Sequence, residues 1–305
     1  MAMAGEKGRG RWIVIAVPYL WLLILFLVPF FIVFKISLSQ DVIASPPYTP
    51  QLDLGQGWEG FTAFLSQLSF ANYAYVLDWS NEFIGAYGSS LVIASVSTLL
   101  LLMVGYPIAY GMARAPRALQ ATLLMMVILP FWTSFLIRVY AWISILSREG
   151  FLNQVLLGLG LINEPLEILN SDLAVYIGIV YSYLPFMVLP LYSALEKLDD
   201  TLLEAAQDLG CTPFKAFWLV TFPLSLPGVV AGALLCFIPI VGEFVIPDLL
   251  GGSDTMMIGK SLWTEFSVNR SWTSSSAVAV LLLLVLVVPI VLYQNIQSRQ
   301  LEAGK

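Results

Sequence analysis

Six apolar stretches, each long enough to cross a membrane as a helix, constrain the fold of this 305-residue chain more than any other feature. Crossing about 30 Å of hydrocarbon takes roughly 20 helical residues. The stretches are residues 12–34, 87–113, 119–146, 173–195, 226–250 and 275–294. We interpret the first as an uncleaved span, because its apolar core is longer than that of a signal peptide. The pattern predicts an all-α polytopic membrane protein with six transmembrane helices.

The composition excludes several classes of function. Hydrophobic residues make up 59% of the chain and charged residues 11%, against about 25% charged residues in a soluble domain. The chain contains no histidine, which removes Ser-His-Asp and Cys-His catalysis and histidine metal sites. Its two cysteines, Cys211 and Cys236, lack metal-ligand spacing and are expected to be free thiols. A net charge of −6 argues against nucleic acid as a partner.

The basic residues of the loops predict the orientation of the chain. One side of the predicted membrane carries nine of them, namely Lys7, Arg9, Arg11, Arg114, Arg117, Lys197, Lys215, Arg299 and Lys305. The other side carries four, namely Lys35, Arg148, Lys260 and Arg270. Because cytoplasmic loops are enriched in Lys and Arg, we expect both termini to be cytoplasmic.

The predicted outer loops are acidic, with eleven Asp and Glu residues against the four basic ones. Positive-inside sorting alone can leave this side short of Lys and Arg. A functional interpretation is that the negative field raises the local concentration of cations. The first outer loop, residues 35–86, contains Pro and Gly turn signals, and its aromatic residues from Phe61 to Trp79 favour a helix at the membrane surface.

The predicted cytoplasmic loop 198–225 contains the signals of two short helices. Asp199, Asp200 and Thr201 are residues that begin a helix, and Gly210 can end it in the left-handed conformation. Thr212 and Pro213 begin a second helix, and we expect Pro223 to end it. The apolar residues of this pair are Leu202, Leu203, Ala206, Leu209, Phe217 and Trp218. Nothing else in the chain is available to cover them, so the loop is expected to dock a partner.

This loop resembles the EAA loop of the permease subunits of ABC importers. Glu204-Ala205-Ala206, Gly210 and, after a gap of nine residues, Val220-Thr221-Phe222-Pro223 match the family pattern E-A-A-x3-G-x9-I-x-L-P, apart from Val220 and Phe222. The resemblance extends from about residue 85 to the C-terminus. It implies a type I importer transmembrane domain whose coupling helix docks on an ATPase through Glu204, Ala205, Ala206, Gly210 and Pro223. A phosphate-binding G-x-x-x-x-G-K-[ST] run is absent from the sequence, so no cofactor is expected in this chain, and ATP and Mg²⁺ would bind the ATPase.

Three further segments are similar to the polyamine branch of that family: residues 36–38, residues 128–140 and residues 242–252. The first loop, with Pro46-Pro47-Tyr48-Thr49, is most similar to permease subunits of putrescine importers. The resemblance implies a bacterial inner membrane, a second related permease, two ATPases and a periplasmic polyamine-binding protein. The chain would then divide into residues 1–84, a transmembrane domain 85–296 with the coupling loop, and a cytoplasmic tail 297–305.

Ionisable residues within the spans suggest a substrate path, because such residues usually face a cavity or a partner. Glu243 and Arg138 lie at depth, and Asp248 lies near the outer end of its span. Pro239, Glu243 and Pro247 recur every four residues, so they would share one face of a continuous helix and leave free carbonyls beside a carboxylate. Trp132 and Tyr183 are the predicted aromatic contacts for an alkylammonium group. Alternatively, Glu243 and Arg138 pair with each other, and the aromatic residues only pack the helices.

We therefore predict a non-catalytic permease subunit of an ATP-driven polyamine importer, with putrescine as the first candidate substrate. The rival substrates within transport are spermidine, spermine and ferric ion. A rival from another class is an intramembrane enzyme, for which Glu243 and Asp248 would be the candidate carboxylate pair.

Overall fold

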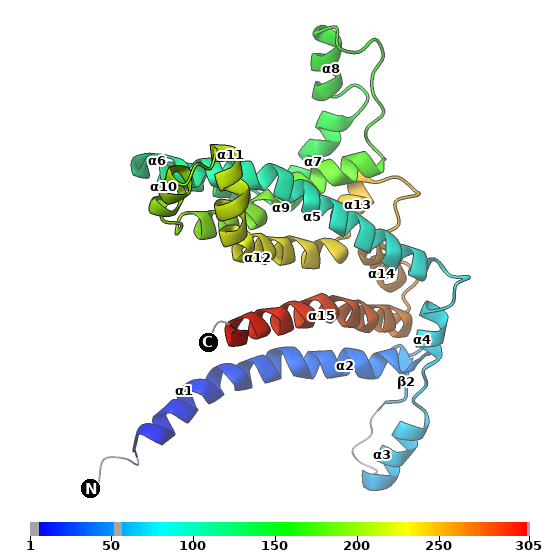
Figure 1. Ribbon diagram of the computed structural model, residues 1–305. Coiled ribbons are helices and arrows are strands. Elements are labelled where there is room, and N and C mark those ends of the chain that lie inside the picture. Colours follow the sequence, from blue (N-terminus) through cyan, green and yellow to red (C-terminus); the bar gives the residue numbers. More distant parts are fainter. Residues whose placement is uncertain (1–5, 52–56, 304–305) are drawn as a thin grey trace. The chain divides into compact units, whose positions relative to one another are not determined.

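The computed structural model describes residues 6–51 and 57–303, and almost all of its regular structure is helical (Figure 1). A two-stranded antiparallel ribbon, β1 (Gln40–Asp41) and β2 (Tyr48–Thr49), pairs Gln40 with Thr49. The chain forms two compact units, the first built from Met1–Ile84 and Leu262–Lys305 and the second from Gly85–Ser261. Helices α5 (Glu82–Arg114) and α14 (Ile258–Ser267) run from one unit into the other.

Unit 1 joins the two ends of the chain. It holds α1 (Glu6–Leu22), η1 (Leu23–Leu27), α2 (Val28–Ser37), α3 (Gly57–Ser66), α4 (Ala71–Val76) and α15 (Trp272–Ala303). Helix α15 packs on α2 and α4. Asn72 on α4 donates to the carbonyls of Ser37 (2.8 Å) and Ser39 (2.7 Å), which fixes α4 against the end of α2. The aromatic segment predicted as one surface helix is therefore two short helices, α3 and α4.

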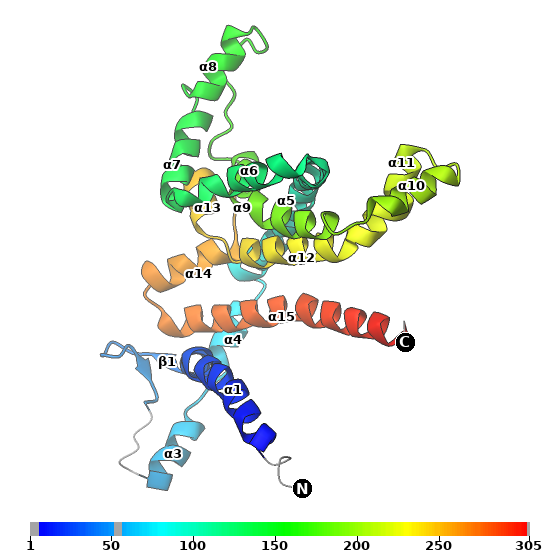
Figure 2. The same ribbon diagram turned by 90° about the vertical axis from the view of Figure 1, so that its left-hand side faces the viewer.

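Unit 2 contains the remaining helices. They are α6 (Arg117–Ile128), η3 (Leu129–Trp132), α7 (Phe135–Leu146), α8 (Phe151–Gly158), α9 (Asp172–Leu195), α10 (Asp200–Asp208), α11 (Pro213–Ala216), η4 (Phe217–Thr221), α12 (Phe222–Val241) and α13 (Val245–Leu250). Helices α9 and α12 lie side by side and make the most extensive helix contact of the unit (Figures 1 and 2). The contact is close because Gly228 has no side chain: a Cβ atom there would lie 2.5 Å from the Cβ of Ala194.

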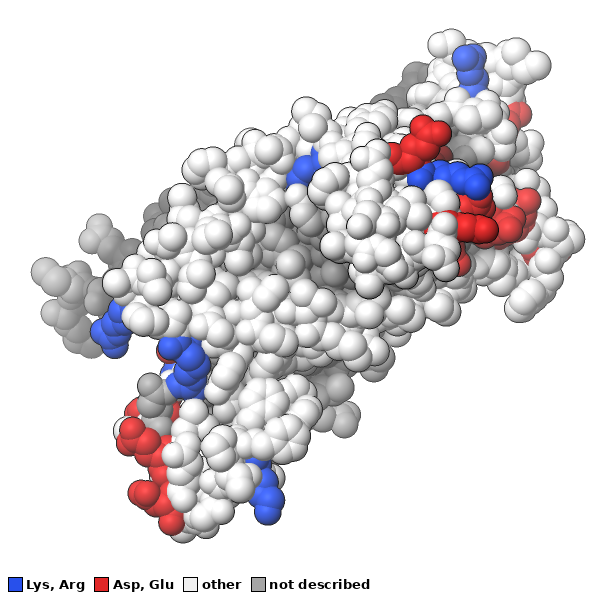
Figure 3. All heavy atoms as spheres, turned by 90° about the horizontal axis from the view of Figure 1, so that it is seen from above, with Lys and Arg blue, Asp and Glu red and all other residues white. Residues whose placement is uncertain are grey.

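Four described helices are long and apolar enough to cross a membrane: Val14–Ser37, Glu82–Arg114, Asp172–Leu195 and Pro213–Val241. A fifth candidate is the pair Arg117–Trp132 and Phe135–Gly158, bent by 88°, and Trp272–Val288 is a shorter apolar helix. Figure 3 shows one face on which most charged side chains, basic and acidic together, gather toward opposite ends, with a broad surface of other residues between them that carries little charge. The chain is thus an all-α membrane protein with four or five candidate spans.

The predicted third span, 119–146, is not one continuous helix. The α-helix gives way to the 3₁₀ turn η3, which contains Pro130. Thr133 is then extended, and Ser134 precedes the first residue of α7. The Thr133 hydroxyl donates to the Pro130 carbonyl at 2.8 Å and closes the corner. The break follows from proline, which cannot donate to the helical ladder.

The expectation that Pro223 ends a helix is wrong. The helix continues from Pro213 to Val241, because the chain widens into the π turn η4 just before the proline. The N–H of Phe222 donates to the carbonyl of Phe217, five residues back instead of four. The same widening, from Val28 to Leu23, precedes Pro29 in the first span. One extra residue in the turn gives the proline ring room beside the preceding backbone.

The expectation that Pro239, Glu243 and Pro247 share one helix face is also wrong. Helix α12 ends at Val241, and α13 begins at Val245 after a break at residues 242–244. The predicted span 226–250 is therefore shifted toward the coupling loop and interrupted at Glu243. The predicted transmembrane domain 85–296 stays a prediction. Its part from Leu262 onward belongs to the compact unit that contains the N-terminal segment.

Candidate functional site: a coupling segment and a buried carboxylate

The predicted coupling segment begins as the sequence indicates. Asp199 caps α10 by accepting a hydrogen bond from the Thr201 N–H at 3.0 Å. This hydrogen bond from the backbone holds the pKa of the Asp199 carboxyl below its ordinary value. The predicted N-terminus of the first helix is confirmed.

The end of α10 is a left-handed glycine turn. Gly210 has φ +86°, its N–H donates to Gln207, and the N–H of Cys211 donates to Ala206. These two bonds satisfy carbonyls that the helix end leaves free. Thr212 then accepts from the Lys215 N–H, and Pro213 stands in the first turn of α11. Both predictions, for Gly210 and for Thr212 with Pro213, are confirmed.

The segment presents apolar side chains without a cover. Leu209 is 87% exposed and Phe214 is 74% exposed, and Leu202 and Trp218 are half-exposed. Ala206 is buried, whereas Glu204, Ala205 and Pro223 are exposed. We call Leu202, Leu209 and Phe214 the coupling surface. Helices α10 and α11 lie at one end of α9 and α12, with α13 at the other end (Figure 2). An exposed apolar surface of this kind is available to a partner.

The candidate substrate residue Glu243 lies in the break between α12 and α13 and is 8% exposed. Its Oε2 accepts from the Tyr183 hydroxyl at 2.5 Å. Its Oε1 accepts from the N–H groups of Val245 (3.0 Å) and Ile246 (3.4 Å) at the start of α13. The carboxylate thus joins α9 to the first turn of α13, which is the favourable end of a helix for a negative charge.

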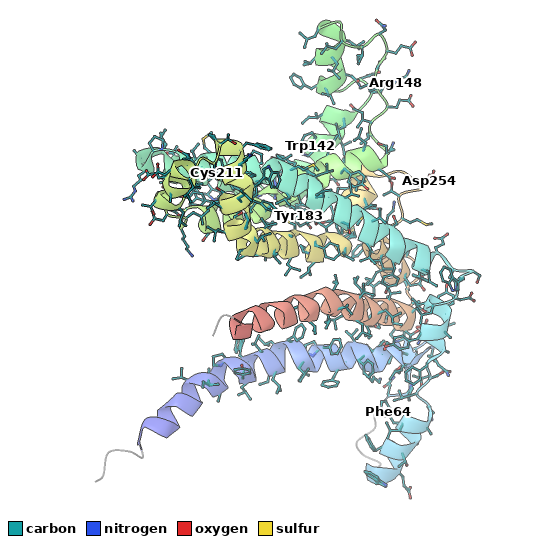
Figure 4. All side chains as sticks on the ribbon, in the orientation of Figure 1. Phe64, Trp142, Arg148, Tyr183, Cys211 and Asp254 are labelled. Atoms are coloured by element: carbon teal, nitrogen blue, oxygen red, sulfur yellow. The ribbon has the colours of Figure 1, made fainter. Side chains whose placement is uncertain are left out.

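Aromatic rings of α9 and η3 lie in contact with one another beside this carboxylate, and Figure 4 labels Tyr183 among them. Tyr183 lies 6.0 Å from Phe186, and Phe186 lies 5.2 Å from Phe131. Trp142 and Tyr181 form a second pair at 5.3 Å. The structure brings Tyr183 and Glu243 together as candidate site residues. Phe131 and Phe186 join them, and no pattern in the sequence separates these two rings from packing aromatics.

The other candidates lie apart from these contacts. Trp132 is 72% exposed on η3, and Asp248 is exposed on α13, with its N–H bonded to the Phe244 carbonyl. The bonds to the Glu243 carboxylate that the described structure records come from Tyr183 and the backbone of α13.

Arg138 on α7 is buried without a carboxylate. It is 8% exposed, and its guanidinium lies over Phe131 (5.2 Å) and Phe135 (5.7 Å). Its Nε and Nη1 lack a hydrogen-bond partner among the described residues. Arg148 and Glu167 do form an ion pair, at 3.4 Å. The alternative in which Arg138 pairs with Glu243 is therefore not realised in this structure.

The chain matches known membrane transport proteins. The family described as binding-protein-dependent transport system inner membrane component matches residues 105–302. The spermidine/putrescine transport system permease protein PotB of Haemophilus influenzae is 38% identical over 288 residues, covering 94% of each chain. The protein of the same name from Escherichia coli is 43% identical over 204 residues, covering 67% of this chain and 74% of its own.

A solved structure shares the fold. In the crystal structure of a bacterial ABC transporter involved in the import of the acidic polysaccharide alginate, a chain superposes with a TM-score of 0.67 at 17% identity. The match covers 97% of this chain and 98% of that chain. At this identity the likeness concerns the fold alone.

Proposed function

The chain belongs to the family of binding-protein-dependent transport system inner membrane components, and we propose that it forms part of the translocation path of a polyamine importer. Membership makes it a multi-pass inner-membrane permease subunit of an ABC transporter, which is a transport component and not an enzyme. The rival interpretation as an intramembrane enzyme is thereby overturned. Membership also implies an ATPase and a binding protein as partners in general.

The observation that carries the substrate class is the identity of 38% across 94% of both chains with a spermidine/putrescine permease. A match over nearly the whole length includes the candidate spans and the loops as well as the coupling loop. We propose putrescine as the first substrate and spermidine as the second. Both are flexible chains with an ammonium group at each end.

The chemistry of Glu243 fits one ammonium end. An ionised carboxylate has about four lone-pair positions, and three are used here, by Tyr183, Val245 and Ile246. One position on Oε2 is left for an N⁺–H donor. A buried carboxylate attracts such a cation far more strongly than an exposed one does. We propose Glu243 as the substrate carboxylate, with Tyr183 as the group that orients it.

The methylene chain and the second ammonium group would meet aromatic faces. Tyr183 and Phe186 are the neighbouring rings next to Glu243, whereas Phe131 already carries the guanidinium of Arg138 over its ring. Each cation–π contact contributes about 0.5–2 kcal/mol, which permits release as well as binding. We place Trp132 at the exposed wall of the path and Asp248 toward its outer end, where the acidic outer loops would raise the local concentration of cations.

The remaining proposals concern assembly. We propose six spans with both termini cytoplasmic, the bent pair α6–α7 and the helix α15 completing the four long helices. Two ATPases would bind ATP and Mg²⁺ and dock on Glu204, Ala205, Ala206, Gly210 and Pro223 of this chain and on a second, related permease. A periplasmic polyamine-binding protein would deliver the substrate.

Uptake into vesicles containing the complete complex tests this proposal. Radiolabelled putrescine should accumulate only when ATP is supplied on the side of the membrane that carries the ATPase. Unlabelled spermidine should compete with the labelled putrescine for uptake. Ferric ion should neither accumulate nor compete. ATP-dependent accumulation of ferric ion, with no effect of either polyamine on uptake, would assign the chain to another substrate.

A further inference from the structure

An aromatic cluster joins the coupling segment to the second span. The ring of Tyr106 on α5 lies 5.5 Å from Phe217 and 6.0 Å from Phe222. Tyr110, one turn further along α5, lies 5.9 Å from Phe217. Phe217 is the first residue of the π turn, and Phe222 follows its last residue. The cluster therefore holds both ends of the π turn against one helix.

A buried hydrogen bond between Tyr106 and Ser225 strengthens the contact between α5 and α12. The Tyr106 hydroxyl lies 2.8 Å from Ser225 Oγ, and both residues are buried. Ser225 donates its own proton to the Phe222 carbonyl at 2.9 Å. A serine hydroxyl has one proton, so Tyr106 must be the donor in the bond between the two side chains. Losing that donor removes a partner at a depth where water cannot replace it.

The π turn η4 is a place where the helix can bend, because its backbone departs from regular α-helical geometry. Phe222 bonds five residues back, and the Thr221 hydroxyl is buried without a partner among the described residues. π turns often occur at functional sites. Helix α10 contacts α11 and η4. A displacement of α10 can therefore reach η4 directly and through α11. Tyr106 and Tyr110 of α5 both contact Phe217 of η4, and Tyr106 alone of the two also bonds to Ser225 among the described residues.

We propose that Tyr106 is a positioning residue that ties the coupling segment to α5, so that α5 and α12 move together when the ATPase displaces α10. The inference rests on the proposed function and names the residue that transmits the motion. Without the Tyr106–Ser225 bond, α12 follows the coupling segment while α5 lags behind. ATP hydrolysis then continues with less transport for each ATP consumed.

Tyr106→Phe tests the proposal with a matched control. The variant keeps the ring contacts and removes the hydroxyl, so the cluster stays packed. Tyr110→Phe is the same change one turn away, where the hydroxyl has no hydrogen-bond partner within the described part of the chain. The measurement is the ratio of polyamine taken up to ATP hydrolysed, in vesicles containing the complete complex. We expect this ratio to fall about fivefold in Tyr106→Phe, which is the effect of losing one ordinary hydrogen bond. The ratio should stay unchanged in Tyr110→Phe.

A merely structural role lowers uptake and hydrolysis together and leaves this ratio unchanged. Equal ratios in Tyr106→Phe, Tyr110→Phe and the unmodified chain would overturn the proposal. A fall in both variants would also overturn it, because it would assign the effect to the rings and not to the bond with Ser225.

A distance measurement separates this inference from the substrate assignment. One spin label is placed on Cys211 in the coupling segment, and the other on a cysteine that replaces exposed Ser95 of α5 (Ser95→Cys). Buried Cys236 is changed to serine, and the partner subunits used lack exposed cysteines. The distance distribution should be the same in nucleotide-free and vanadate-trapped complexes with Tyr106. It should shift or broaden on trapping with Tyr106→Phe, whichever substrate the transporter carries. If the two chains give the same distributions, the link through Tyr106 is refuted, even where polyamine uptake is confirmed.

Discussion

Glu243 would have two roles in this proposal: its carboxylate accepts hydrogen bonds from the start of α13, and its negative charge would bind an ammonium group of the substrate. Glu243→Gln keeps the side-chain shape and a carbonyl oxygen that can accept from Val245 and Ile246. It removes the charge that an ammonium group would meet, so we expect at least a tenfold loss of polyamine uptake, with assembly and ATP hydrolysis retained. Charge-assisted hydrogen bonds are roughly twice as strong as neutral ones. Uptake and binding of labelled polyamine are the measurements.

Arg138→Gln is the comparison for that variant, because Arg138 is equally buried but has no carboxylate partner among the described residues. Glu243→Asp should retain part of the uptake, since it keeps the charge on a shorter side chain. Normal uptake by a folded Glu243→Gln protein would show that the carboxylate is only a helix cap.

Asp199 makes the start of α10 sensitive to acid. Its pKa is lowered in the folded chain by the Thr201 N–H, so its contribution to stability is present above the ordinary aspartate pKa of about 3.9 and is lost as pH falls through the lower folded value. Hydrogen exchange of residues 200–209, corrected for intrinsic rates, should show α10 losing protection below about pH 4. Asp199→Asn should abolish this dependence, because asparagine caps a helix without titrating. Equal acid sensitivity in both proteins would exclude Asp199 as its source.

At the scale of the helices, some features of this fold depend only on residues next to them in the sequence. Asp199, Gly210 and Thr212 act within three residues of themselves, so their caps were predictable from residue type alone. The passage of a helix through Pro223 was not, because the π turn that admits it is also held by Tyr106, more than a hundred residues earlier. The Tyr183–Glu243 bond spans sixty positions. Both residues were predictable as candidates, but no periodicity indicates their contact or the helix break that permits it.

At the scale of the coupling element, Gly210 is required for its conformation and not for its size. No heavy atom lies within 4 Å of a Cβ built there, yet its φ is +86°. Gly210→Val should cost about 1–2 kcal/mol in this conformation and weaken ATPase binding accordingly, by roughly five- to thirtyfold. Gly210→Asn should bind nearly as well, because asparagine tolerates the left-handed region. The measurement is the affinity of each membrane-inserted variant for the ATPase. An equal loss of affinity in Gly210→Val and Gly210→Asn would indicate that any side chain at this position obstructs the ATPase, whatever backbone conformation it tolerates.

At the scale of the whole molecule, we expect this chain to supply one of two walls of the translocation path. One chain supplies one Glu243 and one coupling surface, whereas the two ATPases that we propose would require two. Trp132, Ile137 and Tyr140 on η3 and α7 are exposed beside buried Arg138, and interface cores are enriched in aromatic residues and arginine. Because the single chain leaves this surface open, we expect a second, related permease to cover it.

Purification of this chain with its ATPase alone should therefore give an inactive or unstable product, and adding the second permease should restore uptake. Native mass spectrometry of the active complex should show one copy of this chain, one of the other permease and two ATPases. An uptake-competent complex whose permeases are two copies of this chain would contradict the prediction. In a complex with two copies of this chain, both walls of the path would carry Glu243. Glu243→Gln in only one tagged copy should then leave measurable transport. In the heteromeric complex there is one Glu243, so the same substitution should abolish most of the transport.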